Sequence, residues 1–406
     1  MIDPKRNNNN DDLIEALKTE EDDEIIVTKK SNFEFKDKMK KILLLIVLIT
    51  VLLVIIFWLL SLRAGGKKSF SDVEKVMVSA AKEYYSEHKS LLPSTNKATS
   101  EVSLQKLVNG NYMKEVSKYN SKASNCSGKV IVENNDDSYL YVAYLDCGNN
   151  YTTTELYREI TKSSNVVTSD SGVYYMNNEY VYRGEKVNNF VKMDDNLWRI
   201  VKVDSNNDVV LISNDAYRNT RKWDDRYNSE RKLNYGYNDY KISRIKEFLD
   251  EVYTLSKKGD TSKYNVLPFS KSTAKHLVGY KLCYGNSNFN QSLNNNTYEC
   301  QKVIENTKIG LLTLSDYINA SLDSTCVSPS SKSCQNYNYL SQLKRSWWLV
   351  TGNAANSYEV YEIDDSGRVN IINASGYASV RPVVHLSSKA MYKSGTGSED
   401  NPYIIK

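Results

Sequence analysis

The sequence predicts an α+β protein with a single transmembrane helix followed by two α+β domains. Three observations predict this class: a long apolar run at residues 42–62, six cysteines that all follow that run, and short strand-like segments mixed with amphipathic helices over the remainder. The 406-residue chain has 53 basic and 49 acidic residues and a net charge of +4. This balance gives no field that would attract nucleic acid, so we expect no nucleic-acid partner.

Residues 1–41 contain the polar runs NNNNDD and EEDDE and little apolar periodicity. A segment of this composition cannot bury enough apolar surface to offset the entropy of ordering. We therefore predict a disordered cytoplasmic tail.

Residues 42–62 form an uncharged run that would extend about 31 Å as a helix, the thickness of a bilayer core. No small-residue cleavage motif follows it, since Arg63 and then GGKK come next, so we predict an uncleaved signal anchor. The lysines before the run favour a cytoplasmic N-terminus. The prediction is a single-pass cell-membrane protein with its C-terminal domains outside the cell.

The cysteines are spaced as neighbouring pairs. Cys126 and Cys147 are equidistant from the turn Asn135–Ser138, so they face each other in an antiparallel hairpin. The other two pairs each enclose a polar loop, and the predicted pairs are Cys126 with Cys147, Cys283 with Cys300, and Cys326 with Cys334. Zinc is the alternative, but the sequence has no CxxC motif and three histidines. We expect disulfides and an extracellular location, with no metal and no cofactor.

The first domain after the apolar run is predicted over residues 69–160. Ser71–Glu74 has the spacing of a capping box, which predicts a helix from there to about Leu91. A second short helix is expected from Ser103, with a stop at Asn109-Gly110, before the cysteine-closed hairpin.

This order of elements resembles the head of a type IV pilin or pseudopilin. In that family the apolar segment starts the mature chain and has a glutamate near its beginning. Here about 40 residues precede the run and no glutamate lies in it. The resemblance implies a pilin-like spacer, with a structural component of a surface filament or secretion apparatus as the alternative.

The second domain is predicted over residues 168–406. The segments NLWRIVKVD and DVVLIS are expected to be strands joined by a turn at Asp204–Asp208. This turn lacks the glycine and the glutamate of an EF-hand calcium loop, so we interpret it as a hairpin turn. Ser243 is expected to cap an amphipathic helix, and Ser315 a shorter one.

Five motifs in this domain resemble, in order, those of a widespread bacterial domain of unknown function. They are Trp198-Arg199, Ser243–Leu249, Leu311–Tyr317, Trp347–Leu349 and Val380–Leu386. That domain is similar to the C-type-lectin-like and formylglycine-generating-enzyme folds. The resemblance implies a C-type-lectin-like α+β domain with twisted antiparallel sheets and long loops.

Trp347 and Trp348 raise the question of whether two adjacent indoles form an exposed platform or lie in the core. Successive side chains in a strand point to opposite faces, so at least one of the two points inward. We predict a structural role for Trp347 and Trp348. Arg381, on the closing strand, is likewise expected to be a buried structural arginine paired with a carboxylate.

The polar stretch before the Ser243 helix is the best candidate for ligand binding, because mixed charges around an aromatic residue are typical of recognition loops. The candidate residues are Arg221, Trp223, Asp224, Asp225, Arg226 and Tyr227. The alternative is a solvated loop with one buried tryptophan.

The sequence gives little support for a catalytic function. His276 and His385 are not near a nucleophile elbow, and the sequence contains no P-loop or GxGxxG. The predicted function is therefore non-catalytic recognition of a surface glycan or a protein ligand.

Overall fold

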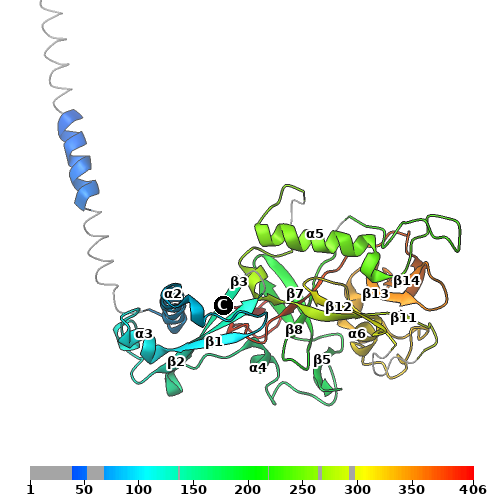
Figure 1. Cartoon of the computed structure of the whole chain (residues 1–406), viewed down its shortest axis with the longest axis horizontal. Helices are drawn as coiled ribbons and strands as arrows, with labels where there is room; N and C mark the ends of the chain where they lie inside the picture. Colours follow the sequence, from blue (N-terminus) through cyan, green and yellow to red (C-terminus); the bar gives the residue numbers. More distant parts are fainter. Residues whose placement is uncertain (1–38, 53–67, 136–137, 218, 264–267, 292–297) are drawn as a thin grey trace, which may run out of the picture. The chain divides into compact units, whose positions relative to one another are not determined.

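The computed structural model describes most of the chain, in two units (Figure 1). The described residues are 39–52, 68–135, 138–217, 219–263, 268–291 and 298–406. The first unit comprises Met1–Lys68 with Lys118–Ser121, and the second comprises Ser69–Ser117 with Lys122–Lys406. Nearly all of both predicted α+β domains therefore belongs to the second unit.

The first unit contains a helix over residues 39–52, whose side chains are exposed. Within the part of the chain that the structure describes, no helix has the length and apolar character needed to cross a bilayer. Residues 53–62 of the predicted span, like the predicted tail at 1–38, lie outside the described residues. The prediction of a transmembrane helix is thus contradicted, and the fold class is corrected to α+β with curled sheets.

The second unit is built from short helices and many short strands. Its α-helices are α2 (Phe70–Glu87), α3 (Leu104–Asn109), α4 (Leu156–Ile160), α5 (Arg244–Lys258) and α6 (Leu314–Asn319). Its strands up to the loop before α5 are β1 (Thr99–Ser103), β2 (Ser127–Asn135), β3 (Ser138–Asp146), β4 (Gly172–Met176), β5 (Glu179–Arg183), β6 (Phe190–Met193), β7 (Asn196–Val203) and β8 (Val209–Ser213). The later strands are β9 (Leu277–Val278), β10 (Tyr280–Tyr284), β11 (Asn286–Ser287), β12 (Lys302–Thr307), β13 (Trp347–Asn353), β14 (Glu359–Ile363), β15 (Val369–Asn373), β16 (Val383–Leu386), β17 (Tyr392–Ser394) and β18 (Tyr403–Ile405).

Among the described residues these strands form four sheets. The first three have the orders β1-β2-β3, β10-β12 and β11-β13-β14-β15. The largest has the order β17-β18-β6-β7-β8-β16-β9, with β5 paired to β7 and β4 paired to β5. Most pairs are antiparallel, whereas β18 pairs with β6 in parallel.

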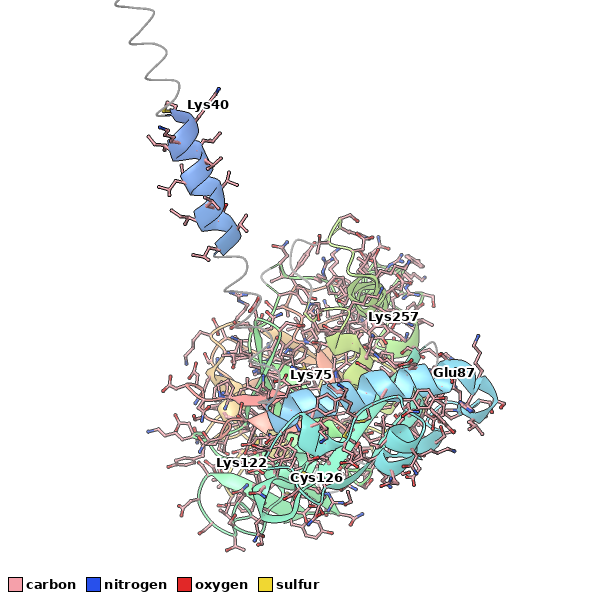
Figure 2. All side chains as sticks on the ribbon, turned by 90° about the vertical axis from the view of Figure 1, so that its left-hand side faces the viewer. Lys40, Lys75, Glu87, Lys122, Cys126 and Lys257 are labelled. Atoms are coloured by element: carbon pink, nitrogen blue, oxygen red, sulfur yellow. A yellow bond between two sulfur atoms is a disulfide. The ribbon has the colours of Figure 1, made fainter. Side chains whose placement is uncertain are left out.

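Helix α2 packs its apolar face on the β2–β3 hairpin (Figure 2 labels Lys75 and Glu87 along this helix). The buried face comprises Val73, Met77, Ala80, Ala81 and Tyr84. The helix begins two residues earlier than the predicted capping box, because the Ser69 hydroxyl accepts the Asp72 amide proton at 3.1 Å. The predicted start at Ser71 was therefore wrong, whereas the α-helix ends at Glu87 and a 3-10 helix at Lys89–Leu91 reaches the predicted end. Ser103 caps α3 as predicted.

Glu74, predicted to belong to the capping box, is instead a buried acceptor. It lies 5% exposed and accepts hydrogen bonds from Thr153 at 2.5 Å and Tyr151 at 2.9 Å. Lys406 forms an ion pair with it at 2.5 Å. A second ion pair joins Lys389, which follows β16, to Glu133 on β2.

The core of the large sheet surrounds β7, β8 and β16, whose residues are almost all buried. The predicted strands at 196–203 and 209–213 are confirmed, and the Asp204–Asp208 turn joins them. Ser243 caps α5 as predicted, with its hydroxyl 3.2 Å from the Lys246 nitrogen. Thr313 rather than Ser315 caps α6, so that prediction was wrong.

Three disulfides join the cysteines in the same pairs that the spacing predicts: Cys126 with Cys147, Cys283 with Cys300, and Cys326 with Cys334. The hairpin register also matches, since Ser127 pairs with Asp146 and Asn135 with Ser138. No free cysteine remains. Three disulfides are consistent with an extracellular protein.

Candidate functional site

The segment 221–227 lies beside the chain that connects β15 to β16. The Arg221 amide donates to the Ala378 carbonyl at 2.8 Å, and the amides of Trp223 and Asp224 both donate to the Ala374 carbonyl. These bonds hold the segment against the connection between β15 and β16. The segment therefore has a defined backbone, unlike a solvated loop.

Trp223 is fully buried beneath this segment. Its indole nitrogen donates to the Leu349 carbonyl at 3.0 Å, and its own carbonyl accepts from the Ile245 amide at 3.0 Å. The prediction that Trp223 contacts a ligand is corrected, because a ring with no exposed surface cannot do so. Trp223 instead ties the segment to both β13 and α5.

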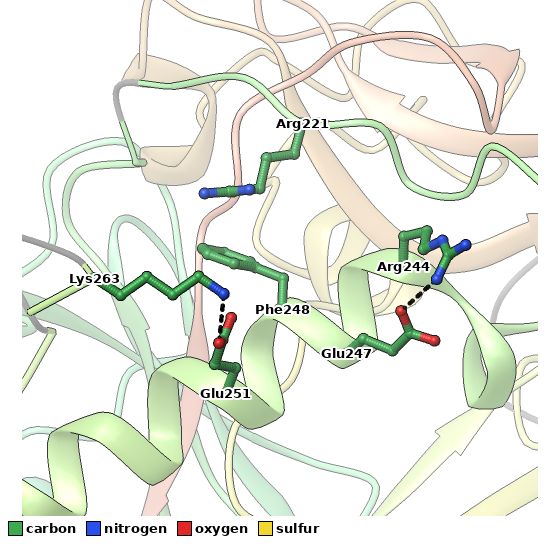
Figure 3. A pocket seen from close by; sticks show the side chains of 6 residues that line it. All are labelled: Arg221, Arg244, Glu247, Phe248, Glu251 and Lys263. Carbon is green, nitrogen blue, oxygen red and sulfur yellow. Dashed lines mark hydrogen bonds and ion pairs between the residues drawn. The ribbon is translucent and has the colours of Figure 1, made fainter.

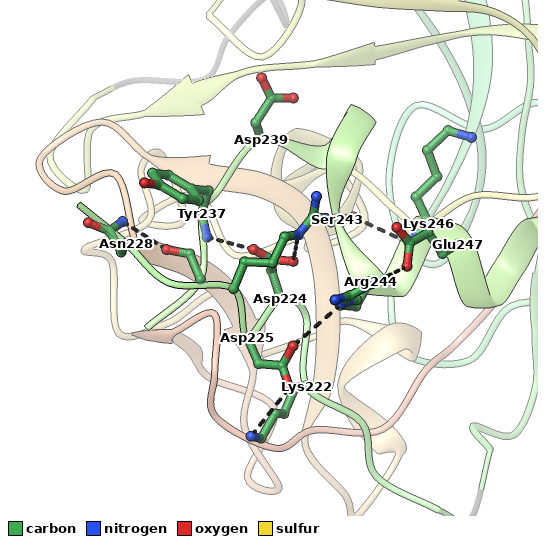
Figure 4. Close-up of polar contacts among 12 residues, drawn as sticks. Lys222, Asp224, Asp225, Asn228, Tyr237, Asp239, Ser243, Arg244, Lys246 and Glu247 are labelled. Atoms are coloured by element: carbon green, nitrogen blue, oxygen red, sulfur yellow. Dashed lines mark hydrogen bonds and ion pairs between the residues drawn. The ribbon is translucent and has the colours of Figure 1, made fainter. Parts of the chain in front are cut away.

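Asp224 is also fully buried and organises the turn that follows (Figure 4). One of its oxygens accepts from Arg226 Nε at 2.9 Å, and the other accepts from the Tyr237 amide at 2.9 Å. Gly236 lies against it with φ +75°, and an added Cβ would come within 2.4 Å of the Asp224 carbonyl oxygen. Asp224 is thus a supporting residue rather than the predicted ligand contact.

Asp225 takes part in a charge network on the surface (Figure 4). Its carboxylate lies 3.6 Å from Lys222 Nζ and 3.5 Å from Arg244 Nε. Arg244 also pairs with Glu247 at 2.9 Å, and that hydrogen bond raises the pKa of Arg244. Because all four side chains are at least one-third exposed, they offer charge to a ligand at little desolvation cost.

A hollow of about 570 Å³ opens between the segment and α5 (Figure 3). It is lined by Arg221, Arg244, Glu247, Phe248, Glu251 and Lys263. The Arg221 guanidinium carbon lies 3.8 Å from the centre of the Phe248 ring, within the range of a cation–π contact. On the other side of the hollow, Lys263 forms an ion pair with Glu251 at 2.5 Å. The hollow therefore presents three cationic and two acidic side chains around one aromatic ring.

Exposed tyrosines also belong to this region. Tyr227 is 58% exposed and Tyr377, next to Ala378, is 63% exposed. Lys222 lies over the Tyr377 ring, with its nitrogen 5.6 Å from the ring centre. Of the predicted set, Arg221, Asp225, Arg226 and Tyr227 thus reach the surface, at least in part.

Trp347 and Trp348 are both fully buried. The Trp348 indole nitrogen donates to the Arg221 carbonyl at 2.7 Å, so this ring supports the candidate site from within. Arg381 is 2% exposed and donates to the backbone carbonyls of Ser213 and Leu340. Among the described residues no carboxylate lies within salt-bridge distance of Arg381, so the predicted carboxylate partner is corrected to backbone oxygens.

A second, smaller cavity of about 230 Å³ lies on the large sheet. Lys202 stands in its wall between Glu179 at 3.0 Å and Asp316 at 3.1 Å. Burial opposes the charge on Lys202, but Asp316 and Glu179 outweigh it and raise the pKa of this lysine. Asp204 and His385 line the same cavity. Sequence reasoning missed this cavity, because its residues come from strands that are far apart in the chain.

No family model, no curated protein and no solved structure matches this chain. The resemblances to pilin heads and to C-type-lectin-like domains stay predictions.

Proposed function

We propose that this protein is an extracellular, non-catalytic recognition protein that binds an anionic glycan in the hollow between segment 221–227 and α5. The observation that supports the proposal most is the set of three cationic side chains, Arg221, Arg244 and Lys263, around one hollow. The volume of about 570 Å³ is within the range of small-ligand sites.

Arg221 is the main contact in this proposal. Its guanidinium is planar and carries donors in a fork that matches a carboxylate or sulfate group. The contact with Phe248 at 3.8 Å limits the freedom of the side chain before a ligand arrives. Less conformational entropy is then lost on binding.

The two acidic side chains of the hollow suit the hydroxyl groups of an acidic sugar. Glu247 and Glu251 are acceptors, and sugar hydroxyls are donors, so both can contribute to recognition once the acidic group of the ligand is bound. Tyr227 and Tyr377 add exposed aromatic surface nearby, which is common where one face of a ligand is apolar. The three disulfides agree with an extracellular site of action.

The test is an array of acidic and matched neutral glycans, probed with the full chain and with Arg221→Gln. We expect binding to acidic glycans, and an affinity at least 10-fold lower for the variant, which is about 1.4 kcal/mol. Arg158→Gln is the matched control, because Arg158 likewise contacts an aromatic ring, at 5.3 Å from the ring of Tyr157 on α4, and does not line the hollow.

Binding to neutral glycans only, or equal loss in both variants, would exclude this hollow as an acidic-sugar site. Failure to bind any glycan, together with saturable binding to an acidic protein that Arg221→Gln weakens, would identify a protein ligand instead.

A further inference from the structure

Three side chains able to bind a metal meet at one end of β8. Asp204 and Asp208 come from the turn between β7 and β8, and His385 comes from β16, which pairs with β8. One possible ligand atom from each of the three lies within 4.8 Å of the others. This group is separate from the hollow beside α5 and plays no part in the proposed glycan recognition.

The backbone of the turn holds both carboxylates in place. Asp204 Oδ1 accepts from the amides of Asn206 and Asp208, both at 2.9 Å. Asp208 Oδ1 accepts from the Ser388 amide at 2.8 Å. One oxygen of each carboxylate is thus engaged with the backbone, and Asp204 Oδ2 faces His385.

His385 has an unsatisfied ring nitrogen that points at this group. The residue is 8% exposed, and its Nδ1 lies 3.6 Å from Asp204 Oδ2, longer than a hydrogen bond. Among the described residues Nδ1 therefore has no hydrogen-bond partner, although it is buried. The Tyr280 ring stacks on the imidazole at 3.7 Å with an angle of 6° and fixes its orientation.

The group carries negative charge that its surroundings do not fully neutralise. Asp208 is only 5% exposed, so solvent screens its carboxylate little. Lys202, which acts on His385 electrostatically, is itself held by Glu179 and Asp316. Histidine binds metals through a neutral imidazole nitrogen, and Nδ1 of His385 is the buried nitrogen that faces the two carboxylates.

We propose that Asp204, Asp208 and His385 bind one divalent transition-metal ion of the zinc class. Two ligand atoms, each about 2.0–2.1 Å from a tetrahedral zinc ion, lie roughly 3.3 Å apart. The observed 3.6 Å between Nδ1 and Oδ2 is close to that separation. The cavity of about 230 Å³ beside them has room for the water that completes the coordination. Calcium fits less well, because it requires six to eight oxygen ligands.

The test is calorimetric titration of the tag-free full chain, stripped with a chelator, with zinc, manganese and calcium chlorides. All cysteines are in disulfides, so no thiolate competes. We expect one zinc ion per chain, bound at least 10-fold more tightly than calcium. Asp204→Asn and Asp208→Asn should each weaken zinc binding at least 10-fold, because the amide keeps the turn acceptor and removes the charge.

Asp364→Asn is the matched control. In the β14–β15 turn, Asp364 Oδ1 also accepts amides two and four residues ahead, from Ser366 at 2.9 Å and Arg368 at 2.8 Å. This variant should bind zinc as the unvaried protein does. Equal weakening in Asp364→Asn and Asp204→Asn would overturn the assignment.

A second measurement does not depend on the site variants. The chain has three histidines, so nitrogen NMR of the imidazoles gives three pairs of ring-nitrogen signals, which His88→Gln and His276→Gln assign by loss. Zinc should shift the ring nitrogens of His385 alone. A shift of another histidine instead, tighter binding of calcium, or no saturable binding of zinc or manganese would each overturn the proposal.

Discussion

Replacing Lys202 with methionine should destabilise the second unit strongly. Lys202 lies between Glu179 at 3.0 Å and Asp316 at 3.1 Å, and the three side chains are 12%, 24% and 13% exposed. At an effective dielectric constant of about 20, each attraction is worth roughly 5 kcal/mol, which offsets the desolvation of the charges. Removing the lysine leaves two carboxylates without their shared cation, so we expect a loss of about 3–5 kcal/mol.

The loss should be measured as the shift of the urea midpoint of the full chain with its disulfides intact. Lys281→Met is the matched control, because Lys281 pairs with Glu305 at 3.2 Å while the two side chains are 75% and 65% exposed. Such a surface pair contributes about 0.2–1 kcal/mol. If Lys202→Met costs no more than Lys281→Met, the buried cluster does not have the energetic role inferred from its geometry.

The pH dependence of Lys202→Met follows from Glu179. Burial raises the pKa of Glu179, and the charge of Lys202 opposes that rise. Without the lysine the folded-state pKa should rise further. An acid whose folded pKa exceeds its unfolded value loses stability as pH rises through that window, so the deficit should be smaller at pH 5 than at pH 7. An equal deficit at both values would contradict this reasoning.

Two further perturbations test the backbone. Gly236→Ala should cost about 1–3 kcal/mol and reduce ligand binding, because its φ is +75° and the new Cβ would meet the Asp224 carbonyl at 2.4 Å. Gly259→Ala, with φ +72° and open space, should cost about 1–2 kcal/mol in the same urea assay, from the left-handed backbone alone. Replacing the pair Cys126–Cys147 by alanines should cost about 3.4 kcal/mol, and the pair Cys326–Cys334 about 2.6 kcal/mol, since the closed loops span 21 and 8 positions. A larger effect of the shorter loop would contradict the chain-entropy account.

Local signals predicted the elements that depend on nearby residues. The spacing of Cys126 and Cys147 around one turn gave both the disulfide and the hairpin register. Ser103 and Ser243 cap helices because the capping hydroxyl and its target amide are three residues apart. These interactions are decided within a few positions, so sequence alone contains them.

Residues engaged by distant parts of the chain were misassigned. Glu74 has the spacing of a capping residue, yet Tyr151, Thr153 and Lys406 draw it into a buried cluster. Ser315 was predicted to cap a helix, but its hydroxyl donates to Glu299 instead. In both cases a tertiary hydrogen bond replaced the local one.

The candidate site was predicted only in part, for the same reason. The composition of segment 221–227 indicates a polar loop, but Trp223 and Asp224 are buried because residue Ala374, about 150 positions later, binds their amides. The approach of His385 to Asp204 was likewise beyond prediction, because it depends on the pairing of β16 with β8. The transmembrane prediction rested on the length of the apolar run alone, and no helix among the described residues is long and apolar enough to cross a bilayer.

The parallel pairing of β18 with β6 has a consequence for biosynthesis. Tyr403 lies opposite Val191, so one edge of β6 has no neighbour until more than 200 further residues have left the ribosome. Meanwhile that nascent strand exposes unpaired amides and carbonyls, with which a second growing chain could associate. We therefore expect that edge of β6 to complete its hydrogen bonds only after the C-terminal segment has been synthesised.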